Sequence, residues 1–128
     1  MEYSPEVVRR FDSARNAGEL KAASAGLVSG EAEDRTLGVW VRFQLQVSDG
    51  IVRAARFAAF GCPHTIAAAD CIAERLEGAP VSELRTLAVR EIQRELGVPV
   101  EKLGKLLRIE DALAACAERC AGRTTRDR

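Results

Sequence analysis

Apolar and polar residues alternate along one stretch in the middle of the chain. The stretch reads GVWVRFQLQV, and the pair Asp49-Gly50 comes shortly after it as a signal for a tight two-residue turn. A second run rich in apolar residues extends from Ile51 to Phe60. The pattern therefore predicts an antiparallel hairpin over residues 38–60 with one buried face. The apolar positions of its first strand are Val39, Val41, Phe43, Leu45 and Val47.

Apolar residues at helical spacing dominate most of the remaining chain. Ser4 and Pro5 are typical of the first residues of a helix, and Pro63 marks a second helix start directly after the hairpin. Glycine and proline after residue 77 and again at 97 to 99 separate this second helix from two later ones. The helices expected from the spacing cover residues 4–17, 63–78, 88–96 and 101–121.

Two segments have no clear period. Residues 21–34 consist largely of alanine, serine, glycine and acidic residues, which suits either a weak edge strand or a mobile loop. Both interpretations remain open at this point. Residues 122–128, GRTTRDR, are polar and basic, and we expect them to form a mobile tail.

The order of the expected elements indicates an α+β fold. One helix, a hairpin and then several helices describe a small antiparallel sheet, formed by the hairpin and an edge strand, with helices packed on one face. The chain of 128 residues suits a single domain. Twenty-one alanines and only 5% aromatic residues indicate a core of Leu, Ile, Val and Ala on closely packed helices.

Charge and hydropathy exclude several classes of function. Nineteen basic and nineteen acidic residues cancel, and no basic stripe with interleaved aromatics is present, which argues against nucleic-acid binding. No apolar run approaches the ~20 residues that span a bilayer, and the first residues lack the apolar core of a signal peptide. We therefore expect a cytoplasmic protein that does not bind membranes.

Cys62 is the residue whose position most clearly suggests chemical reactivity. It lies between Gly61 and Pro63 at the predicted start of a helix, where free N–H groups and the helix dipole favour a thiolate. His64 could act as a second metal ligand or lower the pKa of this thiol. The ordinary alternative, which we favour, is a surface histidine in the first helical turn.

The other three cysteines are better explained as core residues. In the cytoplasm four cysteines are expected to be reduced thiols, and their spacing matches no CxxC motif. Cys116 and Cys120 are four residues apart and could chelate a metal, but they continue an apolar helical stripe. We predict that both of them, and Cys71, are buried small side chains.

Four ordered segments resemble the IscU/NifU-type iron-sulfur cluster assembly scaffolds. YSPEVVRRFDSARNAG, from Tyr3 to Gly18, is similar to the N-terminal pattern of that family, with Ala14 where proline is usual. The hairpin core FQLQV with its Asp-Gly turn, then ARFAAFGC, and finally EDALAA in the last helix follow in the family's order. The resemblance covers nearly the whole chain and implies the same α+β fold.

The resemblance also implies where a cluster site would lie. In this family three cysteines and an aspartate or histidine hold zinc or a nascent [2Fe-2S] cluster. Only Cys62 matches one of these ligands, because Leu37 and Val39 stand where Cys and Asp are expected. Leu103 and Gly104 likewise stand where His and Cys are expected, and a shift of one residue brings in only Lys105.

This ligand loss changes the expected function. Iron-sulfur clusters and structural zinc need about four ligands, so we expect no stable cluster, iron or zinc on the monomer. The resemblance implies a degenerate scaffold that acts as an adaptor, a regulator or a partner of a cysteine desulfurase. The alternatives are a carrier completed by ligands from a second chain or partner, a persulfide relay through Cys62, and a structural domain with no iron-sulfur role.

Two further expectations concern chaperones and catalysis. The family's chaperone-recognition stretch corresponds here to GVPVE at 97–101, with Glu101 in place of lysine, which argues against the usual Hsp70-type chaperone as a partner. No Ser-His-Asp set, paired-carboxylate motif or phosphate-binding glycine loop is visible in the sequence. We therefore do not expect an enzyme.

Overall fold

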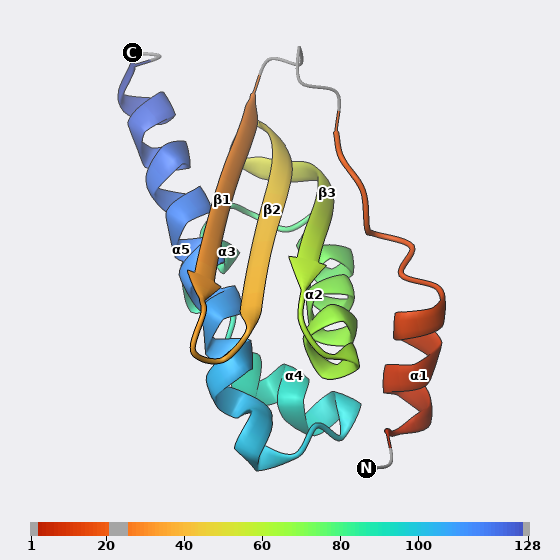
Figure 1. The fold of residues 1–128 in the computed structure, drawn as a ribbon. Helices are drawn as coiled ribbons and strands as arrows, with labels where there is room; N and C mark the ends of the chain where they lie inside the picture. Colours follow the sequence, from red (N-terminus) through yellow and green to blue (C-terminus); the bar gives the residue numbers. More distant parts are fainter. Residues whose placement is uncertain (1–2, 21–25, 127–128) are drawn as a thin grey trace.

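A three-stranded antiparallel sheet with helices on one face forms the protein, as Figure 1 shows. The computed structural model describes residues 3–20 and 26–126. The strands are β1 (Leu27–Asp34), β2 (Val39–Ser48) and β3 (Ile51–Phe60), in the order β1-β2-β3. The helices are α1 (Pro5–Asp12), α2 (Pro63–Leu76), α3 (Glu83–Thr86), α4 (Val89–Leu96) and α5 (Leu103–Arg126), and the short 3-10 helix η1 (Val100–Lys102) precedes α5.

The predicted hairpin is confirmed. Strands β2 and β3 pair from Trp40 opposite Phe60 to Ser48 opposite Ile51. Both turn residues adopt positive φ, at 54° for Asp49 and 73° for Gly50, as a tight two-residue turn between twisted strands requires. Residues 21–34 were expected to form either an edge strand or a mobile loop. For residues 27–34 the edge strand is correct, because β1 pairs with β2 along its whole length. Residues 21–25 lie outside the described residues.

The core lies between the sheet and helices α2 and α5. Alternate residues of β2 point into it, and Val41, Phe43 and Leu45 are fully buried there. Helix α5 crosses β1 so closely that Gly30 has no room for a side chain. A Cβ at this position would lie 2.6 Å from both the Ala112 carbonyl oxygen and the Cys116 backbone nitrogen. Glycine is therefore needed where the two layers make their closest approach.

Helix α1 is shorter than predicted. It ends at Asp12 instead of residue 17, because the chain turns away at Ser13 and runs beside β3. The Phe57 backbone N–H donates to the Asn16 carbonyl oxygen at 3.0 Å, and its carbonyl oxygen accepts from Gly18 at 2.9 Å. The backbone polar groups of this segment are thus satisfied by the sheet edge, which competes with continued helix.

The other helix ends need smaller corrections. Helix α2 ends at Leu76, two residues before the predicted end, because Glu77 is extended and its carboxylate accepts from the Ala55 N–H at 3.0 Å. Helix α5 extends through residues 122–126, which the sequence analysis assigned to the tail. This segment contains no proline, and Gly122 alone weakens a helix by only about 1 kcal/mol. Among the described helices, none combines the length and apolar character that a membrane span requires.

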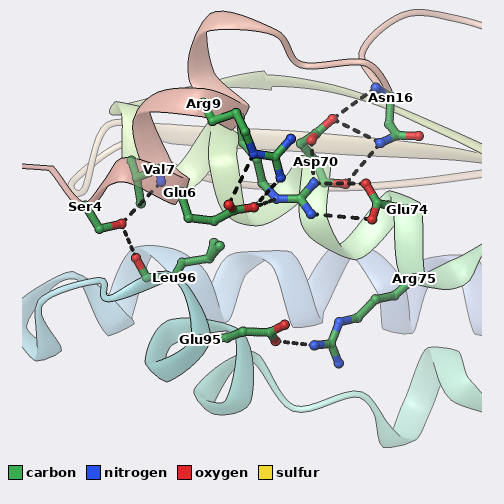
Figure 2. A network of polar contacts seen from close by, with 11 residues as sticks. Ser4, Glu6, Val7, Arg9, Asn16, Asp70, Glu74, Arg75, Glu95 and Leu96 are labelled. Carbon is green, nitrogen blue, oxygen red and sulfur yellow. Dashed lines mark hydrogen bonds and ion pairs between the residues drawn. The ribbon is translucent and has the colours of Figure 1, made fainter.

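A buried ion pair attaches α1 to α2 (Figure 2). The Arg10 guanidinium contacts the Asp70 carboxylate at 2.7 Å, and both side chains are almost fully buried. Asp70 also accepts from the backbone and side-chain nitrogens of Asn16, at 3.0 and 3.1 Å. Burial disfavours the charge on Arg10, but hydrogen bonds to Glu74 and Asp70 raise its pKa above the ordinary value. The network fixes both α1 and the segment after it.

Candidate functional site

Three segments that are distant in sequence meet at one end of the molecule. They are the β1–β2 turn, the start of α2 and the start of α5, all at the lower end of Figure 1. The turn is shaped by Gly38, whose φ is 68°, and by the Leu37 N–H, which donates to the Asp34 carboxylate at 3.1 Å. The Leu37 side chain then lies 3.7 Å from the place where a Cβ on Gly104 would be. Two positions that the family resemblance pairs with ligands are thus neighbours here.

Cys62 is the N-cap residue of α2. Its backbone is extended, with φ of −80° and ψ of 167°, as expected for the residue before a proline at the first helical position. The side chain is partly exposed, and its Sγ lies 3.7 Å from the Thr65 hydroxyl. The sequence prediction for the place of this thiol in the fold is therefore confirmed.

The surroundings of Cys62 favour the thiolate. Burial raises the pKa of the Cys62 thiol, whereas hydrogen bonding from the backbone and hydroxyl of Thr65 lowers it. The backbone of His64 and the positive charge of Lys105 lower it further, so the pKa lies below the ordinary value of a cysteine. Because the thiolate is the reactive form of cysteine, a lowered pKa favours reactivity of this thiol.

His64 is buried, which corrects the expectation of a surface histidine. Only 1% of the residue is exposed, and its ring lies against Tyr3 with 4.7 Å between ring centroids. Burial lowers the pKa of His64, and the charges of Lys102 and Lys105 lower it further. The neutral form of the side chain is therefore favoured. The long-range contact that covers it, from the N-terminal segment, has no local signal in the sequence.

The other cysteines are core residues, as predicted. Cys71, Cys116 and Cys120 are all buried. Cys116 donates to the Phe43 carbonyl oxygen at 3.7 Å, and burial together with the neighbouring Cys120 raises its pKa to about 12. Cys116 lies twelve residues beyond Gly104 on α5, or about 18 Å along the helix axis. It is therefore remote from the start of α5.

The side chains at this end do not fit a resident iron-sulfur cluster or zinc ion. Across the part of the chain that the structure describes, no three His, Cys, Asp or Glu side chains gather closely enough to hold a metal ion. Val39 is buried and Leu103 packs against the core, so both serve packing. Leucine, valine and glycine offer no side-chain donor, and Lys105 adds a positive charge near the one thiol.

Exposed large apolar side chains occur on the β1–β2 turn and on the segments just before α2 and α5, a feature that the sequence analysis did not predict. Leu37 is on the β1–β2 turn, Phe60 ends β3 two residues before Cys62, and Val100 begins η1. Phe60 and Val100 are each 71% exposed, and Leu37 is 38% exposed.

A three-stranded sheet with helices on one face and a cysteine, Cys62, at a helix start is the arrangement of a class of small α+β scaffold domains. This chain belongs to the family of NifU-like N-terminal domains, whose family model matches residues 2–127. The resemblance seen in the sequence is thus confirmed.

Similar proteins and a similar solved structure agree with this family. The iron-sulfur cluster assembly scaffold protein IscU of Azotobacter vinelandii is 30% identical over 116 residues, which cover 90% of this chain and 91% of that protein. Iron sulfur cluster assembly protein 2, mitochondrial, of Saccharomyces cerevisiae is 30% identical, with coverage of 88% and 74%. A NifU-like protein (N-terminal) of Brucella abortus has a similar fold, with a TM-score of 0.69, 19% identity and coverage of 89% and 90%.

Proposed function

We propose that this protein is a cytoplasmic member of the iron-sulfur cluster assembly scaffolds that holds no cluster on its own side chains. In this proposal it is not an enzyme. It acts as an adaptor or regulator that binds a cysteine desulfurase and offers Cys62 as a sulfur acceptor. The expectation that an Hsp70-type chaperone is not a regular partner, based on Glu101, belongs to the same proposal.

One observation carries this proposal. At the end where the β1–β2 turn meets the starts of α2 and α5, no three His, Cys, Asp or Glu side chains of the described residues gather to hold a metal ion, and Cys62 is the thiol found there. A cluster or zinc ion needs about four donors, whereas a sulfur acceptor needs one reactive thiolate. The partly exposed Cys62, with its lowered pKa, meets the second requirement.

The sulfur step needs no further reagent. The Cys62 thiolate attacks the outer sulfur of a persulfide on the donor cysteine, and a new S–S bond forms at Cys62. The S–S bond of the donor breaks, and its inner sulfur leaves as a thiolate. The outer sulfur changes partner without net oxidation or reduction. The exposed apolar residues Leu37, Phe60 and Val100 offer apolar surface to which a donor protein could bind.

Metal content is the first measurement that tests the proposal. The protein purified under anaerobic conditions, and again after incubation with iron and sulfide, should contain neither stoichiometric zinc nor a stable [2Fe-2S] absorption band. A cluster that is retained by the monomer and lost in Cys62→Ser would refute the proposal. A cluster retained only by a dimer or by a complex with glutathione would favour the alternative of a carrier completed by external ligands.

Partner capture is the second measurement. The wild-type protein should recover a cysteine desulfurase from cytosol, and incubation with that enzyme and cysteine should add one sulfur atom to the peptide that contains Cys62. Cys71→Ser is the matched control, because Cys71 is buried and should not accept sulfur. Sulfur found on another cysteine, or no sulfur despite binding, would refute the role of Cys62.

A further inference from the structure

The hydroxyl of Thr65 lies beside the sulfur of Cys62. Thr65 is fully buried, whereas Cys62 is partly exposed, and the Thr65 Oγ1 lies 3.7 Å from the Cys62 Sγ. The Thr65 backbone N–H also donates to the Cys62 carbonyl oxygen at 3.0 Å, so the two residues are held together within the first turn of α2. The hydroxyl therefore contacts the sulfur from the protein side and leaves its solvent side open to a reacting molecule.

Packing fixes the Thr65 side chain in this position. A Cβ on Gly61 would lie 3.3 Å from both the Cβ and the Oγ1 of Thr65, so the threonine fills the space beside the glycine. Threonine is branched at Cβ, which restricts its χ1 rotation. Across residues 3–20 and 26–126, the Cys62 sulfur is the only hydrogen-bond partner of this hydroxyl. Because a buried polar group without a partner is costly, the hydroxyl is held to the sulfur.

The protonation state of the sulfur determines the strength of this contact. Either group can donate when the thiol is neutral, whereas only the hydroxyl can donate when the sulfur is a thiolate. A hydrogen bond to an ionised acceptor is about twice as strong as one between two neutral groups. The contact therefore stabilises the Cys62 thiolate more than it stabilises the thiol.

We infer that Thr65 is a positioning residue for sulfur transfer, which helps Cys62 both to accept a sulfur atom and to release it. This inference rests on the proposed role of Cys62 as a sulfur acceptor, and it extends that role from an end point to a relay. The hydroxyl donates to the Cys62 sulfur whenever that sulfur carries the negative charge. It makes and breaks no covalent bond itself.

Both steps of the relay balance without an oxidant or a reductant. In acceptance, the Cys62 thiolate bonds to the outer sulfur of the donor persulfide, and the donor leaves as a thiolate. In release, the thiolate of an acceptor thiol bonds to that outer sulfur, which keeps its proton, and Cys62 leaves as a thiolate. The negative charge is thus on Cys62 at the start of the first step and at the end of the second.

Removal of the hydroxyl should change acceptance with a sign that depends on pH. Thr65→Val replaces the hydroxyl by a methyl group of similar size, and dithiodipyridine, a neutral disulfide, reports the reactivity of Cys62. The pKa of Cys62, fitted to the pH dependence of the rate, should rise by about one unit. The rate at pH 7 should fall about threefold, whereas the rate constant of the ionised thiol should rise about threefold, because a more basic thiolate is the stronger nucleophile.

Two further variants separate this effect from damage to the fold. Thr65→Ser keeps the hydroxyl and should retain a pKa and a rate constant close to those of the wild-type protein. Thr86→Val is the matched control, because Thr86 is exposed and its hydroxyl donates to the Ser82 carbonyl oxygen at 3.4 Å. Local loss of structure around Cys62 would raise the rate at every pH, whereas loss of the hydroxyl changes it in opposite directions. A folded Thr65→Val with the wild-type pKa would overturn the inference, as would a Thr65→Ser that behaves like Thr65→Val.

Sulfur release is the second measurement. Protein that carries one sulfur atom on Cys62 is mixed with glutathione, and mass spectrometry follows the glutathione hydropersulfide that forms. Thr65→Val should release sulfur about threefold more slowly than the wild-type protein, because a thiolate of higher pKa is the poorer leaving group. Release at the wild-type rate or faster would overturn the relay. Because the disulfide reagent needs no partner, the Thr65 effect can fail while Cys62 still accepts sulfur from a desulfurase, and the reverse is equally possible.

Discussion

The four thiols of this chain differ because of what surrounds each sulfur. Cys62 is at the N-cap of α2, beside backbone N–H groups and the charge of Lys105, and its pKa is lowered. Burial raises the pKa of Cys71 and that of Cys116. Residue type alone therefore does not decide the reactivity of these thiols. A position at a helix start lowers the pKa of a thiol, whereas exclusion from water raises it.

This contrast predicts the order in which the thiols react. Iodoacetamide labelling between pH 6 and 9, read by peptide mass spectrometry, should modify Cys62 before Cys71 and Cys116, with the largest advantage at the lowest pH. The sign follows from the pKa directions, because a lowered pKa keeps Cys62 ionised at pH values where the raised groups are protonated. Labelling of Cys116 at the same rate as Cys62 in the folded protein would contradict the structure.

Helix α1 is attached to the rest of the fold by the buried side chain of Val7 and by polar contacts with α2 and α4. Arg10 and Asp70 form the buried pair, and the Ser4 hydroxyl accepts from Val7 at 3.2 Å and donates to the Leu96 carbonyl oxygen. Removing one partner of a buried pair leaves the other charge without compensation, which costs more than the pair itself contributes. The position of this helix thus depends strongly on a single arginine.

Substitution of that arginine should destabilise the protein. Arg10→Met should lower the free energy of unfolding by about 3 kcal/mol, because Asp70 would remain buried without its guanidinium partner. Arg9→Met is the matched control: Arg9 is exposed and pairs with Glu6 at the surface, so the free energy of unfolding should hardly change. Urea unfolding curves measure both variants. Equal losses would show that the buried pair has no special role.

The sequence predicted some elements well because their signals are local. The alternation in β2 and the Asp49-Gly50 turn determine the hairpin within a few residues of each other. The end of α1 could not be predicted, because Asn16 leaves the helix for contacts with Asp70 and Phe57 far along the chain. The burial of His64 depends in the same way on the packing of distant segments.

At the scale of the whole molecule, the topology brings the β1–β2 turn and the starts of α2 and α5 to one end of the fold (Figure 1). Leu37 on the sheet side faces Gly104 on the helix side, and Lys105 lies close enough to act on Cys62. The resemblance in sequence suggested these positions and the neighbouring Lys105, and in the structure the charge of Lys105 lowers the pKa of Cys62.

Restoring thiols at two of these positions should restore metal binding. The combination of Leu37→Cys and Gly104→Cys with the native Cys62 would place three thiolates at one end of the molecule, and Gly104 has room for a Cβ. We expect stoichiometric zinc in this variant by metal analysis, and none in the control that carries Leu37→Ser and Gly104→Ser. A folded cysteine variant that takes up no zinc would show that the three positions do not converge.

The two ends of the chain differ as places to attach a tag or a surface anchor. Tyr3 contacts the ring of His64, two residues from Cys62, whereas α5 runs to the opposite end of the molecule (Figure 1). A fusion at the N-terminus would therefore lie beside the reactive thiol and would hinder the approach of another molecule to it. Immobilisation through the C-terminus instead directs the thiol toward the surrounding solution.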